Sequence, residues 1–135
     1  MSKSVFINLP TQNVAAAREF YAKLGLTINE EYSNEQNAFV IVDENIQLIL
    51  ASHDFFKQND PRDIADTSKT TEVSIAIQVE SREDVDRLFN AAIAAGGKQA
   101  GETIEEVEIG MYSRGLTDLD GHRFDLLSMT LPAAS

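Results

Sequence analysis

The sequence predicts an α+β fold made of two βαβββ modules. An apolar, strand-like segment is followed by an amphipathic helical segment twice, first within residues 5–25 and again within residues 72–97. After each helical segment come three shorter extended segments separated by turn residues. The same order of elements in both halves of a 135-residue chain indicates one domain, residues 1–135, with an internal repeat.

The first module begins with the strand "VFINLP" at residues 5–10. A helix is expected at residues 13–25, where Gly25 suits the position just after the last turn. Its apolar face consists of Val14, Ala17, Phe20, Tyr21 and Leu24. The extended segments that follow are expected at residues 26–32, 38–42 and 46–52. "SHDFFKQ", which comes next, predicts a short helical turn.

The second module begins with the strand "EVSIAIQVE" at residues 72–80. The helix expected at residues 81–97 starts with Ser81 and Asp84 in the arrangement of a capping box. Its apolar face consists of Val85, Leu88, Phe89, Ala92 and Ile93. Three extended segments follow, at residues 101–109, 111–117 and 123–129.

Shifting the sequence by about 68 residues superimposes the two halves. Phe6 then falls on Ser74, Leu9 on Ile77, Phe20 on Leu88 and Tyr21 on Phe89. We therefore place the modules at about residues 1–56 and 72–131. The polar segment 57–71, which contains Pro61, is expected to link them.

Composition excludes several classes of function. The chain has 22 acidic and 11 basic residues, a net charge of −11, which repels the phosphate backbone of nucleic acids. The absence of cysteine excludes disulfides, thiolate zinc sites and cysteine nucleophiles. No apolar run approaches the roughly 20 residues of a membrane helix. We therefore expect a cytoplasmic protein that has neither nucleic-acid nor membrane partners.

The order of these segments resembles the vicinal oxygen chelate superfamily, also called the glyoxalase/bleomycin-resistance/extradiol-dioxygenase superfamily. The segments are "FINLPTQNVAAAREFYAKLGL", "IQLILASHDFFKQ", "TTEVSIAIQVESREDVDRLFNAAIAAGGK" and "MYSRGLTDLDGHRFDLL". The resemblance is closest to the bacterial group labelled predicted lactoylglutathione lyases. It implies curved mixed sheets around a cavity that takes a small-molecule ligand, and a homodimer. It also implies that metal-using members bind a divalent ion through His, Glu or Gln on the first and last strands of each module.

Carried over to this chain, the four ligand positions of that pattern fall on Phe6, Gln47, Ser74 and Asp125, with Gln47 as the counterpart of Asp125. None of the four is an imidazole, and a phenyl ring cannot bind a metal. A shift of two residues along the strands keeps the same face but is no better for a metal. It substitutes Asn8, Ile49, Ala76 and Leu127. We therefore expect no metal ligand and no cofactor, with a divalent metal only under an alternative function.

Asp125 is the candidate catalytic residue. It alternates with Phe124 and Leu126, so it is expected to face the cavity, where desolvation would raise its pKa and let it act as a base in enolising or isomerising chemistry. The alternative is a structural hydrogen bond to Tyr112, Arg114 or a backbone amide. Tyr112 and Arg114 share a face of their strand, where they are candidates to anchor an anionic or aromatic ligand, or else lie at the surface.

"TDLDGHRFDLL", residues 117–127, also contains Asp118, Asp120 and His122. The Asp and Gly residues are typical of a tight turn, and the spacing lacks the third acidic position and final Glu of a calcium loop. We interpret "DLDG" as a hairpin corner and His122 as a turn residue. His53 is expected at a helix start or at the surface.

These observations favour a protein that binds a small organic molecule in a metal-poor cavity. The ligand-binding candidates are Phe6, Asn8, Gln47, Ser74, Tyr112 and Arg114. One alternative is a metal-dependent lyase or isomerase resembling lactoylglutathione lyase, which would use Gln47 and Asp125. The second alternative is a drug-sequestering resistance protein of the bleomycin-binding type. The sequence leaves open whether the protein is an enzyme.

Overall fold

The chain divides into two compact units, Met1–Asp66 and Thr67–Ser135, in a computed structural model that describes residues 2–130. The division falls inside the predicted linker, and each unit contains one of the two predicted modules. The predicted end of the second module, Leu131, lies outside the described residues. We describe each module by itself.

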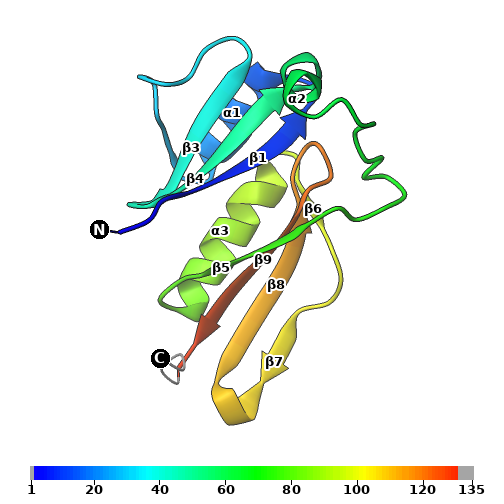
Figure 1. Ribbon diagram of the computed structural model, residues 1–135. Coiled ribbons are helices and arrows are strands. Elements are labelled where there is room, and N and C mark those ends of the chain that lie inside the picture. The colour runs from blue at the N-terminus through cyan, green and yellow to red at the C-terminus, as the bar shows by residue number, and fades with distance from the viewer. Residues whose placement is uncertain (1, 131–135) are drawn as a thin grey trace. The chain divides into compact units, whose positions relative to one another are not determined.

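The first module is a βαβββ unit followed by a short helix (Figure 1). Strand β1 pairs in parallel with β4, and the order across the sheet is β1-β4-β3-β2, with the remaining pairs antiparallel. The elements are β1 (Val5–Thr11), α1 (Val14–Lys23), β2 (Thr27–Ile28), β3 (Asn37–Asp43), β4 (Ile46–Ser52) and α2 (His53–Asn59).

Helix α1 begins and ends as the sequence predicts. The side-chain oxygen of Asn13 caps its start by accepting a hydrogen bond from the Ala16 amide at 3.0 Å. At its end Gly25 has a φ of +94°, and the amides of Gly25 and Leu26 donate to carbonyls of the last turn. The helix packs on β3 and β4. The buried residues of this layer are Ala17, Phe20, Tyr21, Ala38, Val40, Leu48 and Leu50.

The second module repeats the plan with a longer helix. Its strand order is β5-β9-β8-β6, with β5 and β9 parallel and β8 antiparallel to its neighbours. The elements are β5 (Ser74–Gln78), α3 (Arg82–Ala94), β6 (Lys98–Gln99), β7 (Ile104–Glu106), the 3-10 turn η1 (Val107–Ile109), β8 (Met111–Thr117) and β9 (Arg123–Met129).

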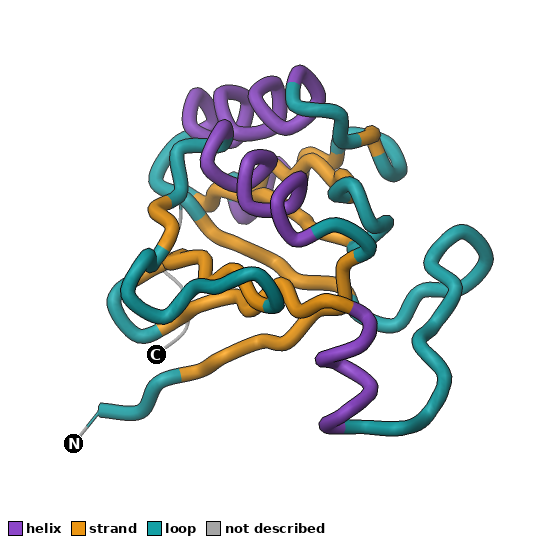
Figure 2. Tube along the Cα trace, turned by 90° about the horizontal axis from the view of Figure 1, so that it is seen from above, coloured by secondary structure: helices purple, strands orange, loops and turns teal. Residues whose placement is uncertain are grey.

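Helix α3 is capped in the same way as α1. The Ser81 hydroxyl accepts a hydrogen bond from the Asp84 amide at 3.1 Å, and Gly96 has a φ of +108° just after the last turn. Val85, Phe89 and Ala92 are buried, and the helix packs on β8 and β9. Figure 2 shows a long helix lying against the strands in each module.

Two extended segments are shorter than the sequence predicts. Within residues 26–32 only β2 is a strand, because the Ser33 amide and hydroxyl both bond to the Asn29 carbonyl and turn the chain. Within residues 101–109 only β7 is a strand, and it ends in the 3-10 turn η1. The edge of the second sheet is instead shared, since β6 and β7 both pair with β8.

The predicted α+β fold of two βαβββ modules is confirmed. The predicted helical turn after β4 is a full helix, α2, which extends into residues 57–59 of the predicted linker. The rest of that segment is divided between the two units. No helix within residues 2–130 combines the length and apolar character needed to cross a membrane.

Candidate functional site

Each sheet has one face covered by its helix and a second face, which we call the open face of the module. On β9 the side chains of Phe124 and Leu126 are buried, and those of Arg123 and Asp125 alternate with them on the open face. On β5 the neighbouring open-face residue is Ser74, because Ser74 and Arg123 are partners in the parallel register.

Ser74, Arg123 and Asp125 form one polar group on the open face of the second module. One carboxylate oxygen of Asp125, Oδ2, accepts a hydrogen bond from the Ser74 hydroxyl, with 2.9 Å between the two oxygen atoms. The other, Oδ1, accepts from Arg123 Nη2 at 3.0 Å. The side chains of Arg123 and Asp125 are 36% and 27% exposed, so the group is accessible. Its two charges lie within hydrogen-bond distance of each other.

Gly115 makes room for this group on the adjacent strand. It lies opposite Asp125 in the β8–β9 register, and its carbonyl accepts from the Ala100 amide at 2.9 Å. A Cβ at Gly115 would lie 2.4 Å from the Ala100 carbonyl oxygen and 2.7 Å from Arg123 Nη2. The edge strand is interrupted between β6 and β7 at this point. The Arg123 side chain therefore lies where Gly115 has no side chain.

Sequence reasoning placed Asp125 on this face but missed Arg123. In the first module Phe6 pairs with Gln47 across the parallel strands, whereas in the second module Ser74 pairs with Arg123. By strand register the counterpart of Gln47 is therefore Arg123, two residues before Asp125. The available signal was alternation, because a residue two positions before Asp125 must share its face.

Rings and amides occupy the open face of the first module. The ring of Phe39 contacts Phe6 at 6.4 Å between centroids in an edge arrangement, and Tyr32 at 5.9 Å. Phe6 is 46% and Tyr32 58% exposed. Three predicted ligand residues, Phe6, Asn8 and Gln47, thus lie on one face. Of these, Asn8 is exposed on β1.

Gln47 is held beside this aromatic group by an amide contact. Its Oε1 is 3.5 Å from Asn29 Nδ2, the outer limit of a hydrogen bond. Asn29 follows β2, and its amide donates to the Phe39 carbonyl. The open face of the first module thus combines a ring surface with amide donors and acceptors.

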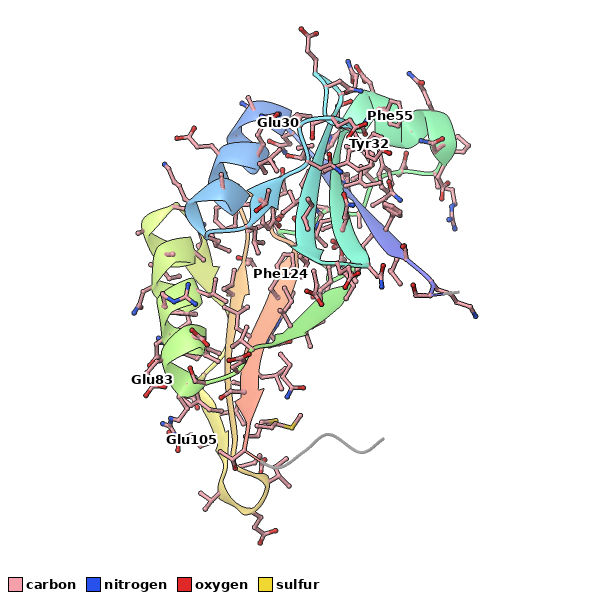
Figure 3. The ribbon with its side chains drawn as sticks, turned by 90° about the vertical axis from the view of Figure 1, so that its left-hand side faces the viewer. Glu30, Tyr32, Phe55, Glu83, Glu105 and Phe124 are labelled. Atoms are coloured by element: carbon pink, nitrogen blue, oxygen red, sulfur yellow. The ribbon has the colours of Figure 1, made fainter. Side chains whose placement is uncertain are left out.

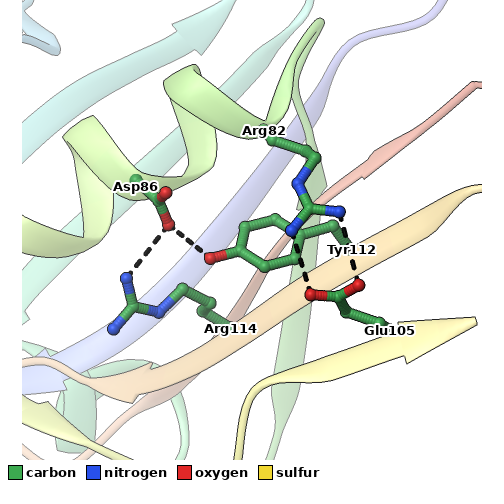
Figure 4. A network of polar contacts seen from close by, with 5 residues as sticks. All are labelled: Arg82, Asp86, Glu105, Tyr112 and Arg114. Carbon is green, nitrogen blue, oxygen red and sulfur yellow. Dashed lines mark hydrogen bonds and ion pairs between the residues drawn. The ribbon is translucent and has the colours of Figure 1, made fainter.

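Tyr112 and Arg114 lie on the opposite face of the second sheet from Asp125. Both reach Asp86 on α3, whose Oδ1 accepts from the Tyr112 hydroxyl at 2.6 Å and from Arg114 Nη1 at 3.0 Å (Figure 4). The guanidinium of Arg114 also stacks 3.7 Å from the centroid of Phe89. The predicted pairing of Tyr112 with Arg114 on one face is present. Neither residue bonds Asp125, whose partners are Ser74 and Arg123.

The hydrogen bonds to Asp86 shift two pKa values in opposite directions. The Tyr112 hydroxyl, followed by Arg114, lowers the pKa of Asp86 below its ordinary value of 3.8. The same bond stabilises the protonated phenol, and together with burial it raises the pKa of Tyr112 above 10.0. Sequence reasoning missed Asp86, which lies on α3 directly after the buried Val85.

Arg82 extends this network to the edge of the sheet. Its guanidinium lies 4.2 Å from the Tyr112 ring centroid and pairs with Glu105 at 2.9 Å. Figure 3 shows Glu105 near Glu83 at the end of the module where α3 begins and β7 lies. The network joins α3, β7 and β8, and its contacts are those of a structural connection.

Residues 118–122 form the predicted hairpin corner. Asp118 Oδ1 accepts from the amides of Asp120 and His122, each at 2.9 Å, as in an Asx turn. His122 is buried rather than exposed, at 1%, and its Nδ1 is 2.5 Å from Glu72 Oε1. Side-chain ligand atoms of Asp118, Asp120 and His122 also lie within 4.8 Å of one another, a spacing that one cation can span.

A comparison with models of protein families shows which family this chain belongs to. The model of the Glyoxalase/Bleomycin resistance protein/Dioxygenase superfamily matches residues 3–126. The chain belongs to this superfamily. No curated protein matches the sequence.

Several solved structures share the fold. A hypothetical protein from S. aureus is 28% identical with a TM-score of 0.79, covering 95% of this chain and 94% of its own. A glyoxalase-related enzyme from Fulvimarina pelagi is 17% identical, with a TM-score of 0.79 and coverage of 98% and 100%. The fosfomycin resistance protein FosX from Listeria monocytogenes is 20% identical, with a TM-score of 0.69 and coverage of 97% and 96%.

The four metal positions of the glyoxalase pattern do not fit a divalent ion in this chain. Phe6 has no ligand atom, and the Gln47 oxygen faces an amide donor. Ser74 donates a hydrogen bond to Asp125, and the Asp125 carboxylate is paired with the Arg123 cation. A guanidinium at 3.0 Å repels a second cation at the same carboxylate.

Proposed function

We propose that this glyoxalase-fold protein binds a small organic molecule on the open face of its second module and uses no divalent metal at the four glyoxalase positions. The observation that carries the proposal is the ion pair between Arg123 and Asp125. Asp125 is the one carboxylate among the four positions, and an arginine cation already neutralises it. The exposed rings beside Gln47 form a separate surface on the open face of the first module, which suits a planar, apolar group.

Asp125 is the residue we propose for any proton transfer on the ligand. Ser74 and Arg123 each donate to a different oxygen, so both oxygens are held in place and each keeps a further lone pair. A carboxylate oriented in this way accepts an N–H or O–H from a ligand, or removes a proton next to a carbonyl. We expect Asp125→Asn to weaken ligand binding through a donor group, and to abolish turnover if turnover occurs.

Metal content tests the proposal directly. Purified protein incubated with nickel, zinc or manganese and then desalted is expected to retain far less than one ion per chain. One tightly bound ion per chain that is lost in Asp125→Asn contradicts the proposal. An ion lost in Asp118→Asn and kept in Asp125→Asn would instead lie at the hairpin corner, and the proposal for the four positions would stand.

The competing lyase function makes a separate prediction. A metal-dependent enzyme resembling lactoylglutathione lyase turns over the hemithioacetal of methylglyoxal and glutathione, and a chelator abolishes that turnover. We expect no such turnover with any of the three metals. Chelator-sensitive turnover that Asp125→Asn reduces would replace our proposal with the lyase function.

Drug sequestration is a second candidate, supported by the rings of Phe6, Phe39 and Tyr32 on one open face. The superfamily description includes bleomycin resistance, and one similar structure is a fosfomycin resistance protein. Thermal shift with bleomycin and with fosfomycin tests this function. Stabilisation by bleomycin that is lost in Phe6→Ala supports sequestration, and no stabilisation by either drug removes it.

We also propose that the protein is a homodimer. Val5 and Ile46 are exposed apolar side chains on β1 and β4, and they are register partners. Sedimentation velocity is expected to show a dimer for the wild type and a monomer for Val5→Asp. Val107→Asp, at an 87% exposed apolar site of the other module, is the matched control and should stay dimeric. A monomeric wild type contradicts the proposal.

A further inference from the structure

The two arginines on the neighbouring strands β8 and β9 differ in how accessible their guanidinium groups are. Arg114 is bonded to Asp86, stacked on Phe89 and 21% exposed. Arg123 is more exposed, and Asp125 is the one hydrogen-bond partner of its guanidinium among the residues that the structure describes. Arg123 therefore has N–H donors that no described protein group uses.

The guanidinium of Arg123 is also held in position. Its Nη2 is bonded to Asp125, and it lies beside two glycines, at 2.7 Å from the Cβ that Gly115 lacks and 3.7 Å from the one that Gly101 lacks. A side chain at Gly115 would displace it. An arginine held in this way loses little conformational entropy when it binds a ligand.

We propose that Arg123 binds an anionic oxygen group of the ligand, a carboxylate or a phosphate, at the open face of the second module. The planar fork of a guanidinium matches both groups. A chain with a net charge of −11 repels anions in general, so an anionic ligand requires a cation positioned to receive it. The inference rests on the proposed function, because it assigns the class of ligand to the same open face.

Asp125 has two opposing effects on anion binding by Arg123. It orients Arg123, but its negative charge repels an incoming anion and occupies one donor. Removing that charge while keeping the shape, as in Asp125→Asn, should therefore tighten anion binding severalfold. The same substitution should weaken any function in which Asp125 accepts a proton.

The test is an NMR titration of the full chain with potassium phosphate and, separately, with potassium acetate, against potassium chloride at matched ionic strength. Saturable amide shifts are expected on β5, β8 and β9 with phosphate, with acetate, or with both. The arm with the lower Kd identifies the preferred anion. Arg123→Gln should abolish saturation, Arg123→Lys should weaken it severalfold, and Asp125→Asn should lower the Kd.

The matched control is Arg87→Gln on the outer side of α3, where Arg87 pairs with Asp84. It should leave the titration unchanged, and dispersed spectra of every variant confirm folding. The inference would be overturned if chloride produced the same chemical-shift changes. An unchanged Kd in Arg123→Gln or a higher Kd in Asp125→Asn would also overturn it. Tight metal binding at Asp125 would remove the proposed function, whereas loss of anion binding alone would remove only the role of Arg123.

Discussion

The two modules share a backbone plan but differ on their open faces. The first presents the rings of Phe6, Phe39 and Tyr32 beside an amide pair. The second presents Arg123 and Asp125, a pair of opposite charges whose carboxylate also accepts a hydrogen bond from Ser74. An internal repeat explains the shared plan, because helix caps, strand order and apolar core are what a βαβββ unit needs to fold. The open face is under no such constraint, so it can diverge toward ligand chemistry.

The helix-facing sides differ as well. Helix α1 is held by the apolar packing of its buried Ala17, Phe20 and Tyr21, while its charged Arg18 pairs with Glu30 near the surface. Helix α3 is tied to β8 by Asp86, which bonds two partly or fully buried side chains. The second module therefore adds polar contacts to the apolar packing that both helices share. Four tests can break or sharpen this comparison.

Gly115→Ala is expected to have the largest effect, a loss of about 3 kcal/mol in the free energy of unfolding. The new methyl group would meet the Ala100 carbonyl oxygen at 2.4 Å, so backbone must shift. Urea unfolding measures the loss. The control in the first module is Gly25→Ala, which has open space but a φ of +94° and should cost only about 1 kcal/mol. Equal losses would show that Gly115 is not a tightly packed position.

Asp86→Ala should cost about 2 kcal/mol, because it leaves the buried Tyr112 hydroxyl and Arg114 without their shared acceptor. Chemical denaturation of both variants gives the comparison. Breaking the ion pair of the first module with Arg18→Gln should cost less than about 1 kcal/mol, since Glu30 is well exposed. A loss in Asp86→Ala no larger than that of Arg18→Gln would contradict the network's structural role.

The helix caps should show where the modules are alike. Asn13→Ala and Ser81→Ala each remove one side-chain acceptor of an N-terminal amide, so each should cost about 1 kcal/mol. The double variant should lose the sum of the two, because the caps share no partner. Thermal and urea unfolding of the three variants tests this. A twofold difference between the single variants would mean that the modules do not share this feature.

The pH dependence of the Asp86 network should be the smallest effect, because the Asp86 side chain is 45% exposed and therefore screened. A lowered pKa in the folded state means that Asp86 contributes stability above pH 3.8, which is lost as pH falls through the folded pKa. Tyr112 has a raised pKa, so its contribution is complete below pH 10.0 and is lost as pH rises through the folded pKa.

The measurement is the difference in Tm between the wild type and Asp86→Asn as a function of pH. The difference should be constant across the neutral range and shrink at both ends. Arg18→Gln in the first module provides the reference difference. A difference for Asp86→Asn that is flat from acid to alkaline pH would show that the two bonds to Asp86 add nothing to stability.

Much of the fold could be predicted from the sequence. Three predicted segments, 46–52, 111–117 and 123–129, coincide with β4, β8 and β9. Each of these strands is a seven-residue extended segment bounded by turn residues, so the local sequence identifies it. The short edge strands β2, β6 and β7 were misjudged or missed, because pairing with β3 or β8 defines them and local pattern does not.

The candidate site was less predictable. Alternation along one strand placed Asp125 on the open face, and the same rule puts Tyr112 and Arg114 on one face together. The packing of β8 against α3 decides that this is the helix-covered face. Asp86 lies on that helix four residues after Arg82 and accepts hydrogen bonds from both side chains. The position of the Arg123 guanidinium depends on Gly115 on the next strand and lies near the Ala100 carbonyl at the edge of the sheet. Both residues are distant from Arg123 in the sequence.

By itself the sequence determined the repeat, the helices with their caps, the long strands and the absence of imidazoles from the four metal positions. These are properties of spacing and residue type along a short stretch of chain. Only the tertiary structure decided which side chains meet: Arg123 with Asp125 over Gly115, Asp86 with Tyr112 and Arg114, and Glu72 with the buried His122. Such contacts arise from strand register and from packing between segments that are remote in the sequence.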